Sequence, residues 1–412
     1  MVIMNYPIII GAQINSPSQG IYRPEAYGAA GDGIANDTAK VQAALDAATA
    51  AGGGTVKLDR TYGYTKTAEA PSPVGPYPVS YGLWLNSSNV IIDGGGNGVL
   101  KLLSMPTFTN PFIGFLIGNG GFSGSFPSGG WDWLEANGTW TSHVTFKDIS
   151  FNHSVLTDAN LLTLTTGSFN SVLAMIFCED SLISGVTIDR AWGSTGGITL
   201  HGSSRRCTVD HCTITLTQKL GFHFDGPADC SFSDLIVAGF LVTTAELGIM
   251  LACNTDYRHD STRCIINHCT LSGVHTGIGT TGFDHTISNN TIHLKDDSTV
   301  HIGVDMGIGD TSLMADDSSR LTVTGNIIDH ASLPRKGWAF HTSGKNATIF
   351  DGLPRIISHC TITGNTITNT DYGYVIDKQS QYNTFQYNTL NNAAISVDIS
   401  SGTAIENIVS PN

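Results

Sequence analysis

The stretch "TRCIINHCTLSGVHTGIGTT", residues 262–281, is one copy of a pattern that recurs along the chain. Each copy holds an alternating strand, a corner residue of the Cys or Asn type, a two-residue apolar step, a polar turn and a second alternating strand. Such self-similarity is the signature of a repeat architecture. The other clear copies are "RRCTVDHCTITLTQKLGFHFDG" (205–226), "FDHTISNNTIHLKDDSTVHIGVDMG" (283–307), "RLTVTGNIIDHASLPRKGWAFHTSG" (320–344) and "RIISHCTITGNTITNTDYGYVIDKQ" (355–379).

One unit of this size cannot bury its own apolar face, so successive units must stack. Stacking coil on coil predicts an all-β fold, a right-handed parallel β-helix, in which each strand pairs with its equivalent one rung away at about 4.8 Å. Equivalent residues then form columns along the helix. The corner column is predicted to hold Val186, Cys212, Leu235, Cys269, Asn290, Asn326, Asn365 and Asn388.

The cysteines and asparagines are expected to have structural roles. Eight cysteines are too few for a disulfide scaffold in 412 residues, and their spacing matches no known zinc site. We expect buried thiols, with one interior column made of Cys207, Cys230, Cys264 and Cys360. The asparagines are expected at a corner, where Asn tolerates left-handed backbone.

The N-terminal region predicts a cap. An open end of a β-helix exposes core and unpaired strand edges. "TAKVQAALDAATAAG", residues 38–52, has apolar residues at helical spacing, so it is expected to form a helix across that end. Asp37 or Thr38 is the expected N-cap, and Gly52 the expected stop.

At this point the sequence resembles a known family. "YGAAGDGIANDTAKVQAALDAA" followed by "GGGTVKL" is similar to the N-terminal signature of the pectate-lyase-like β-helix superfamily, which includes phage tailspike depolymerases, pectinolytic enzymes and alginate epimerases. The resemblance is specific over residues 22–66 and implies a β-helix with polysaccharide chemistry. Neither the "NTD", "GHG" and "RIK" set of polygalacturonases nor the "DPHE" of alginate epimerases is present, so no catalytic residue is carried over.

The predicted organisation has three parts. Residues 1–21 form an N-terminal extension, 22–66 the cap with the first strands, and 67–412 the parallel β-helix, with an aromatic insertion at about 120–140.

Composition excludes several partners. The formal net charge of −14 repels phosphate backbones and anionic membranes, and no stretch reaches the length of a membrane span. We therefore expect neither a nucleic-acid partner nor a membrane partner. No cofactor or metal is expected, and nothing in the sequence indicates a bound calcium.

The second strand of each copy carries the candidate chemistry. In "GITLH" (197–201) and "GFHFD" (221–225), positions two and four are large and apolar and should face inward, whereas positions one, three and five should face outward. The glycines at position one predict a shallow outer trough suited to a sugar chain. Position five is predicted to form a column of His201, Asp225, Ala252, Thr281, Asp305, His341 and Asp377.

Asp225 is the expected catalytic acid or base, with His201 and His223 as its orienting partners. One rung, about 4.8 Å, separates His201 from Asp225, and two residues, about 6.6 Å, separate His223 from Asp225. Glu246 and Asp305 are candidate second carboxylates. Six strand positions, about 20 Å, separate Asp225 from Glu246, and about three rungs separate it from Asp305. Both separations exceed the roughly 5–9.5 Å of a glycosidase pair unless the backbone turns.

Basic and aromatic side chains are the candidate substrate contacts. The basic ones stand just before the glycines, and the tryptophans lie in or beside the insertion, where their faces could stack on sugars. These residues are Lys219, His275, Arg335, Trp131, Trp133 and Trp140.

The expected function is cleavage of glycosidic bonds in a polysaccharide held in an elongated surface groove, by a glycoside hydrolase that uses carboxylates. Two alternatives stay open: a polysaccharide lyase acting by β-elimination on an acidic glycan, and a non-catalytic carbohydrate-binding tail or adhesin protein. The protein is expected to be extracellular or virion-associated and to form a homo-oligomer, in the family's manner a trimer.

Overall fold

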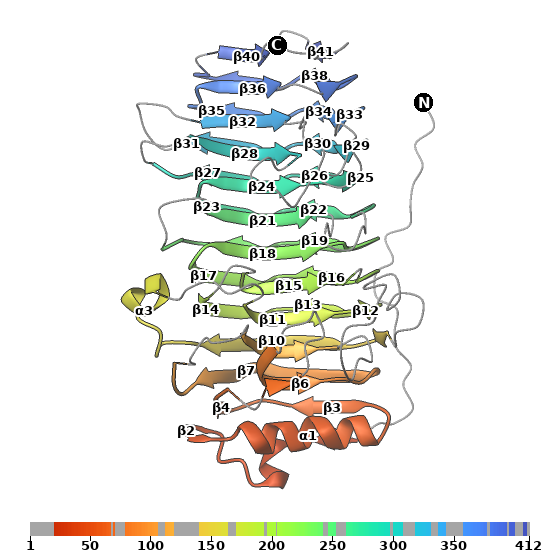
Figure 1. Ribbon diagram of the computed structural model, residues 1–412, viewed down its shortest axis with the longest axis vertical. Coiled ribbons are helices and arrows are strands. Elements are labelled where there is room, and N and C mark those ends of the chain that lie inside the picture. The colour runs from red at the N-terminus through yellow and green to blue at the C-terminus, as the bar shows by residue number, and fades with distance from the viewer. Residues whose placement is uncertain are drawn as a thin grey trace.

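The computed structural model shows a solenoid of stacked coils with a helix at one end (Figure 1). It describes residues 20–66, 69–70, 79–105, 112–118, 140–163, 170–192, 196–202, 204–241, 246–252, 261–296, 300–307, 318–330, 337–342, 357–376, 380–393, 395–399 and 407–409. Nearly every strand pairs in parallel with the equivalent strand of the next coil, which confirms the predicted parallel β-helix.

One wall of the solenoid is a 12-stranded sheet. We call it the front wall. Its strands are β5 (Glu69–Ala70), β6 (Val79–Leu85), β8 (Phe112–Ile117), β11 (Ser171–Ile176), β15 (Ile198–His201), β18 (Leu220–Asp225), β21 (Leu247–Ala252), β24 (Thr276–Thr280), β28 (His301–Met306), β32 (Gly337–Thr342), β36 (Tyr372–Ile376) and β40 (Ile395–Ile399).

The remaining perimeter is a 23-stranded sheet that bends at a corner, which we call the back wall. One of its two strand rows holds β1 (Ile21–Tyr22), β3 (Gly54–Lys57), β7 (Val90–Leu102), β10 (Thr145–Asn152), β13 (Leu182–Ser184), β16 (Thr208–Asp210), β19 (Ser231–Ser233), β22 (Ile265–Asn267), β26 (Thr286–Ser288), β30 (Thr322–Thr324), β34 (Thr361–Thr363), β38 (Thr384–Gln386) and β41 (Ile408–Val409). The other row holds β2 (Asp32–Asn36), β4 (Thr61–Tyr64), β14 (Thr187–Ala191), β17 (Thr213–Thr217), β20 (Ile236–Val237), β23 (Thr270–Val274), β27 (Thr291–Leu294), β31 (Ile327–His330), β35 (Thr366–Thr368) and β39 (Thr389–Asn391), and β7 and β10 span both rows.

Short strands pair at the corner that follows the front wall. They are β9 (Thr141–Ser142) with β12 (Cys178–Glu179), and then β25 (Gly282–Phe283), β29 (Ser318–Ser319), β33 (Ile357–Ser358) and β37 (Ser380–Gln381). The described helices are η1 (Pro24–Tyr27), α1 (Thr38–Ala50) and α3 (Asp158–Thr163).

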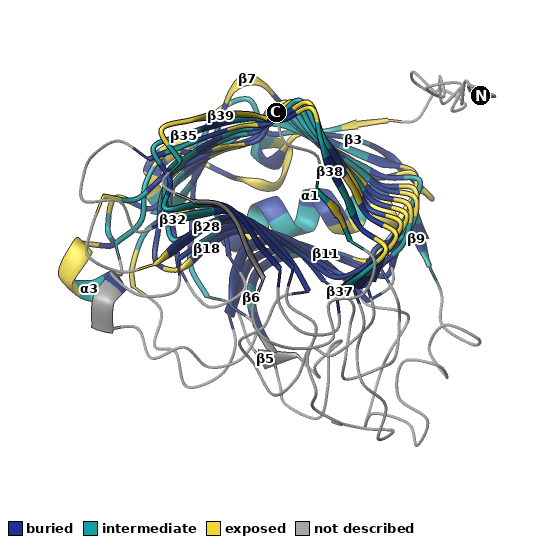
Figure 2. Ribbon diagram, turned by 90° about the horizontal axis from the view of Figure 1, so that it is seen from above, coloured by how far each residue is buried: buried dark blue, intermediate teal, exposed yellow. Residues whose placement is uncertain are grey.

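Helix α1 lies across the open end of the coil, as Figure 2 shows, and this confirms the predicted capping helix. Val41, Ala44 and Leu45 of α1 are fully buried in the same core as the rungs. Asp37 stands at the N-cap, yet its carboxylate accepts hydrogen bonds from the backbone N–H groups of Ala30 and Gly31, at 2.9 and 3.0 Å, and not from the helix. The acidic residue of the opening stretch therefore ties down the glycine-rich turn before α1. The domain boundaries expected from the sequence stay a prediction.

The interior columns match the sequence alignment. Each of the eight predicted corner residues directly precedes the first residue of a back-wall strand. These first residues, from Thr187 through Thr213 and Ile236 to Thr389, pair with one another from coil to coil. The cysteine column is also confirmed, and the backbone N–H of Cys207 donates to Cys230 Sγ at 3.3 Å. In the two coils between Cys264 and Cys360, the same column position is held by His285 and Leu321.

The asparagines point into the barrel, which differs from the expected left-handed corner. The Asn326 Oδ1 atom accepts from Asn290 N and from Asn290 Nδ2, at 3.0 and 2.9 Å, and Asn326 N donates in turn to Asn365. The left-handed residue is the one before, with φ of 56° at Asn289 and 68° at Gly325. A buried side-chain ladder can satisfy the backbone N–H groups of the bend, whereas a side chain directed outward could not.

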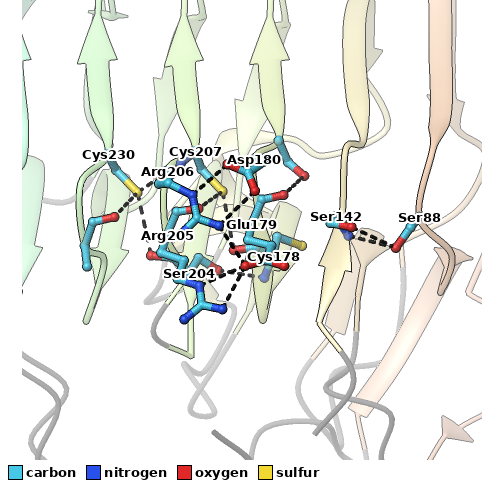
Figure 3. A network of polar contacts seen from close by, with 12 residues as sticks. Ser88, Ser142, Cys178, Glu179, Asp180, Ser204, Arg205, Arg206, Cys207 and Cys230 are labelled. Atoms are coloured by element: carbon cyan, nitrogen blue, oxygen red, sulfur yellow. Dashed lines mark hydrogen bonds and ion pairs between the residues drawn. The ribbon is translucent and has the colours of Figure 1, made fainter. Parts of the chain in front are cut away.

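A second left-handed column runs along the corner beside the cysteines. Its charges alternate over successive coils, in the order Asp180, Arg206, Asp229, Arg263, Asp284 and Arg320. The Arg206 guanidinium lies 2.7 Å from Asp180 (Figure 3), and Arg263 lies 2.6 Å from Asp229. We call this the charged column. It pairs unlike charges one rung apart at the solvent-exposed edge.

Candidate active site

The outer face of the front wall carries two columns of outward side chains, fixed by strand register. The first outer column contains Thr199, His223, Met250, Gly279, Asp305 and His341. The second outer column contains Ile176, His201, Asp225 and Ala252. Inward positions between them are core residues such as Phe222 and Phe224, as the alternation predicts.

The prediction that the glycines line an outer trough is wrong. A Cβ added at Gly221 would lie 2.6 Å from Val237 Cγ2 and 2.6 Å from the carbonyl oxygen of Gly248. The glycine column therefore faces inward, where the wall bends and the back-wall side chains come close. Glycine is required there because the backbone passes next to the core, not because a ligand needs space outside.

The predicted position-five column also needs a correction. Asp305 pairs in register with Gly279 and His341, so both Asp305 and His341 belong to the first outer column with His223. In that rung the glycine that faces inward is Gly303, because a Cβ added there would meet Ile328. His301, which begins the strand, is therefore not the equivalent of the glycines. The alignment was shifted by two residues because a strand pattern of period two looks the same after such a shift.

His201 and Asp225 face each other on adjacent rungs. The His201 Nε2 atom lies 3.5 Å from Asp225 Oδ2, and the two residues are only 7% and 9% exposed. The backbone N–H of Gly202 donates to His201 Nδ1 at 2.7 Å, so the proton of the neutral ring is on Nε2, directed at the carboxylate. Burial, together with the smaller effect of the nearby His223, lowers the pKa of His201 to about 3. The ring is therefore neutral at neutral pH.

His223 completes this group from the same strand as Asp225. It is 7% exposed, and burial lowers the pKa of its imidazole to about 4. Within the described part of the chain, neither of its ring nitrogens has a hydrogen-bond partner. Buried polar atoms without partners are rare in native proteins and cluster at functional sites. The structure thus brings together His201, His223 and Asp225, the three residues that sequence analysis placed at the centre.

The two candidate second carboxylates lie apart from Asp225. Glu246 precedes β21 while Ala252, the neighbour of Asp225, ends it, so the full strand of about 20 Å separates them. Glu246 is fully buried, and its Oε1 lies 2.5 Å from Lys295 Nζ. Asp305 is three rungs from Asp225, about 14 Å along the solenoid. Neither pair reaches the separation that a glycosidase needs.

The predicted contacts Lys219 and His275 share a column with Glu246 at the far edge of the front wall. The register adds His301 to this column, and its ring centroid lies 5.1 Å from that of His275. Lys219 is exposed and His275 half-buried. These residues form a separate polar edge, one strand length away from Asp225.

Of the predicted aromatic contacts, the structure describes Trp140. Its ring packs edge-on against Phe177, and the Arg205 guanidinium lies 4.4 Å from its centroid. Arg205 is also paired with Glu179 (Figure 3). Trp131, Trp133 and Arg335 lie outside the described residues, as does Asp377.

Sequence reasoning missed two residues. Lys295 follows β27 and was not aligned with Glu246, because the two belong to coils two rungs apart. Trp338 lies in "GWAFH", where its position was assigned to the interior, yet it is half-buried and its ring centroid is 4.9 Å from that of His341. A spacing of three residues puts two side chains on opposite faces of a regular strand, so the sequence offered no signal for this contact.

Among the described residues, no group of three or more His, Cys, Asp or Glu side chains is placed to hold a metal ion. None of the described helices has the length and apolar character of a membrane span.

Comparison with known proteins identifies the family. The model of the right handed beta helix region matches residues 197–412, more than half of the chain. Among curated proteins, mannuronan C5-epimerase AlgE5 of Azotobacter vinelandii is 44% identical over 84 residues, 20% of this chain and 8% of that protein. A capsule KN3-specific depolymerase of Klebsiella phage KN3-1 is 30% identical over 158 residues, 37% of this chain and 17% of that protein.

Solved structures share the fold at low identity. The tailspike protein of Escherichia coli bacteriophage HK620, a mutant in complex with a pentasaccharide, gives a TM-score of 0.66 at 14% identity, covering 92% of this chain and 62% of that one. An exopolygalacturonase from Thermotoga maritima gives 0.62 at 10% identity, covering 95% and 92%. The AlgE6 A-module of Azotobacter vinelandii gives 0.56 at 18%, covering 95% and 100%. With the family match, these likenesses confirm the predicted fold: the chain belongs to the right-handed parallel β-helix family.

Proposed function

We propose that this protein is a polysaccharide-cleaving enzyme whose reaction centre is Asp225 with His201 and His223. The observation that carries the proposal is a buried aspartate 3.5 Å from an oriented, neutral histidine, beside a second buried histidine that lacks a hydrogen-bond partner within the described chain. Support comes from the relatives, whose names describe an epimerase of mannuronan, a capsule depolymerase and a polygalacturonase.

In this proposal Asp225 transfers the proton, and His201 holds it in place. Gly202 fixes the His201 ring through Nδ1, so Nε2–H faces the carboxylate and orients it. Because burial keeps both rings neutral, neither compensates the aspartate's charge, and His223 keeps its ring nitrogens available for the substrate.

Hydrolysis is the first candidate reaction. Elimination next to a sugar carboxylate needs a cation to stabilise the enolate. Among the described residues of the two outer columns there is no lysine or arginine, and the chain carries a net charge of −14. Both features disfavour a polyanionic substrate at Asp225 and favour glycosidic bond hydrolysis in a less charged glycan.

Elimination is the second candidate, and the carboxylate geometry favours it. A hydrolase needs a second carboxyl group within about 5–9.5 Å of the first. The nearest other carboxylate that the described register places in the outer columns, Asp305, lies three rungs away. Proton abstraction from a sugar carbon, the first step of elimination, needs one base only.

The deciding experiment incubates the full chain with dextran, galactomannan, alginate, polygalacturonate and bacterial capsules. Reducing ends and the ultraviolet absorbance of unsaturated uronates are measured together. We expect reducing ends without absorbance. Both signals together would assign elimination, and the absence of both on every glycan would leave a binding protein and overturn the proposal.

Assembly and location belong to the same proposal. The tailspike and depolymerase relatives support an extracellular or virion-associated protein, and we expect a homotrimer. Light scattering of the purified chain should give three times the monomer mass of 43.6 kDa.

A further inference from the structure

A second buried histidine–aspartate couple lies farther along the front wall. The His341 Nδ1 atom is 3.0 Å from Asp305 Oδ1, and the residues are 8% and 6% exposed. The half-buried ring of Trp338 lies against His341 at 4.9 Å between centroids. No step of the reaction proposed above uses these three residues.

We propose that Asp305, His341 and Trp338 form a saccharide-binding subsite that takes an uncharged pyranose unit of the same polysaccharide. This inference rests on the proposed function for the nature of the ligand. The subsite would hold the glycan while Asp225, three rungs away, reacts with another unit of the chain.

The chemistry of the three residues matches a neutral sugar. A carboxylate cannot donate, so the His341 ring donates from Nδ1 to Asp305. A carboxylate has about four lone-pair sites, and one donor does not saturate them, so Asp305 can also accept sugar hydroxyl groups. The Trp338 indole offers an apolar face for the C–H side of a pyranose. A uronate is disfavoured, because its charge would meet the negative charge of Asp305 in a buried setting.

Position along the wall connects the subsite to the reaction centre. Asp305 and His223 stand in the same outer column, with Met250 and Gly279 between them. Neither intervening side chain carries a charge. The spacing of about 14 Å between His223 and Asp305 exceeds the length of one monosaccharide. A glycan lying along the solenoid axis would therefore meet both groups only if it spans several sugar units.

A third histidine–aspartate couple provides the contrast and the control. His293 and Asp329 on the back wall lie 2.7 Å apart, with side chains 45% and 34% exposed. No aromatic ring is recorded against His293 among the described residues. Such an exposed pair is an ordinary surface contact.

The experiment compares Trp338→Ala, Trp338→Phe and Asp305→Asn with two controls, Asp329→Asn and Tyr387→Ala. Tyr387 is 80% exposed. Binding is measured by the retardation of each protein in native gels that contain galactomannan, dextran or alginate, and cleavage is measured by steady-state kinetics. Trp338→Ala and Asp305→Asn should weaken binding to the neutral glycan and raise KM about tenfold with kcat nearly unchanged. Trp338→Phe should restore most of the binding, and both controls should match the wild type.

Binding and cleavage separate the two proposals. If no glycan is cleaved but retardation by a neutral glycan still depends on Trp338 and Asp305, the subsite stands and the reaction proposed above fails. If the wild type cleaves and the subsite variants bind and cleave as the wild type does, the subsite is overturned. Retardation by alginate alone would also overturn it, because the ligand would then be acidic.

Discussion

The front and back walls are built from the same repeat, yet their outward polar side chains differ in burial. On the front wall, the side chains of His201 and Asp225 are 8% and 12% exposed. On the back wall, His293 and Asp329 keep 45% and 34% of their side chains exposed. Burying ionisable groups costs free energy that folding must offset elsewhere. On the front wall the buried ionisable groups face outward and lie together, which is the expected signature of a functional face.

The charged column sharpens the same contrast. Its arginines and aspartates sit at exposed left-handed bends, and their pairing follows from alternating charges one rung apart. Exposed pairs of this kind contribute at most about 1 kcal/mol. The alternation of Asp and Arg also keeps like charges from lying on adjacent rungs. The main effect of the charged column is therefore to favour the correct pairing of neighbouring coils.

The strongest test of the difference between the walls is Asp225→Asn against Asp329→Asn. Loss of the proton-transfer group should lower the rate of polysaccharide cleavage by at least about 100-fold. The back-wall substitution should leave the rate unchanged. Both variants should keep the thermal transition of the wild type, measured by circular dichroism. Retained cleavage in Asp225→Asn would remove Asp225 from the mechanism.

The second test is the pH dependence of stability. Burial lowers the pKa of His153 and His201 to about 3 and of His223 to about 4. An unfolded histidine titrates near 6.5, so between about pH 6.5 and 4 the unfolded chain binds more protons and stability falls with falling pH. From pH 7 to pH 5 each buried histidine should contribute a loss of about 2 kcal/mol, measured by urea denaturation.

His223→Gln should make this pH dependence shallower by about one proton. His211→Gln is the matched control, because the His211 side chain is 68% exposed. Equal slopes in the two variants would show that burial does not set the titration of His223.

The third test concerns the bend of the front wall. Gly221→Ala places a Cβ 2.6 Å from Val237 and should lower the free energy of unfolding by about 2 kcal/mol. At Gly239 the nearest atoms to an added Cβ are 3.6 Å away, so Gly239→Ala should change stability by less than about 0.5 kcal/mol. Equal effects would contradict the inward direction of the glycine column.

The smallest effect is expected in the charged column. Asp229→Asn removes the partner of Arg263 and should cost less than about 1 kcal/mol at low salt. In 1 M salt the difference from the wild type should vanish, because screening acts over about 3 Å there. A loss that persists at high salt would indicate that the pair is more than an exposed contact.

Much of the architecture could be predicted from residue patterns. The corner anchors, six of which are Cys or Asn, aligned correctly over eight coils. The Asn side chains satisfy the buried backbone of the bend, a requirement that leaves a mark on the sequence. The predicted front-wall register was wrong by two residues at Asp305 and His341. A shift of two residues leaves the alternation of apolar and polar positions unchanged, so the pattern cannot reveal the error.

The candidate site divides along the same line. His201 and Asp225 could be brought together from the sequence, since rung spacing is a fixed property of parallel strands. The sequence alone also determined the coil, its cap and the inward direction of large apolar side chains such as Phe222 and Phe224. Only the tertiary structure decided that Glu246 pairs with Lys295, that Trp338 meets His341 and that the glycines face the core. Glu246 and Lys295 belong to different coils, and the glycines meet side chains of the back wall, so chain distance does not encode these contacts. Trp338 and His341 share β32, but a spacing of three residues does not put two side chains on one face of a regular strand.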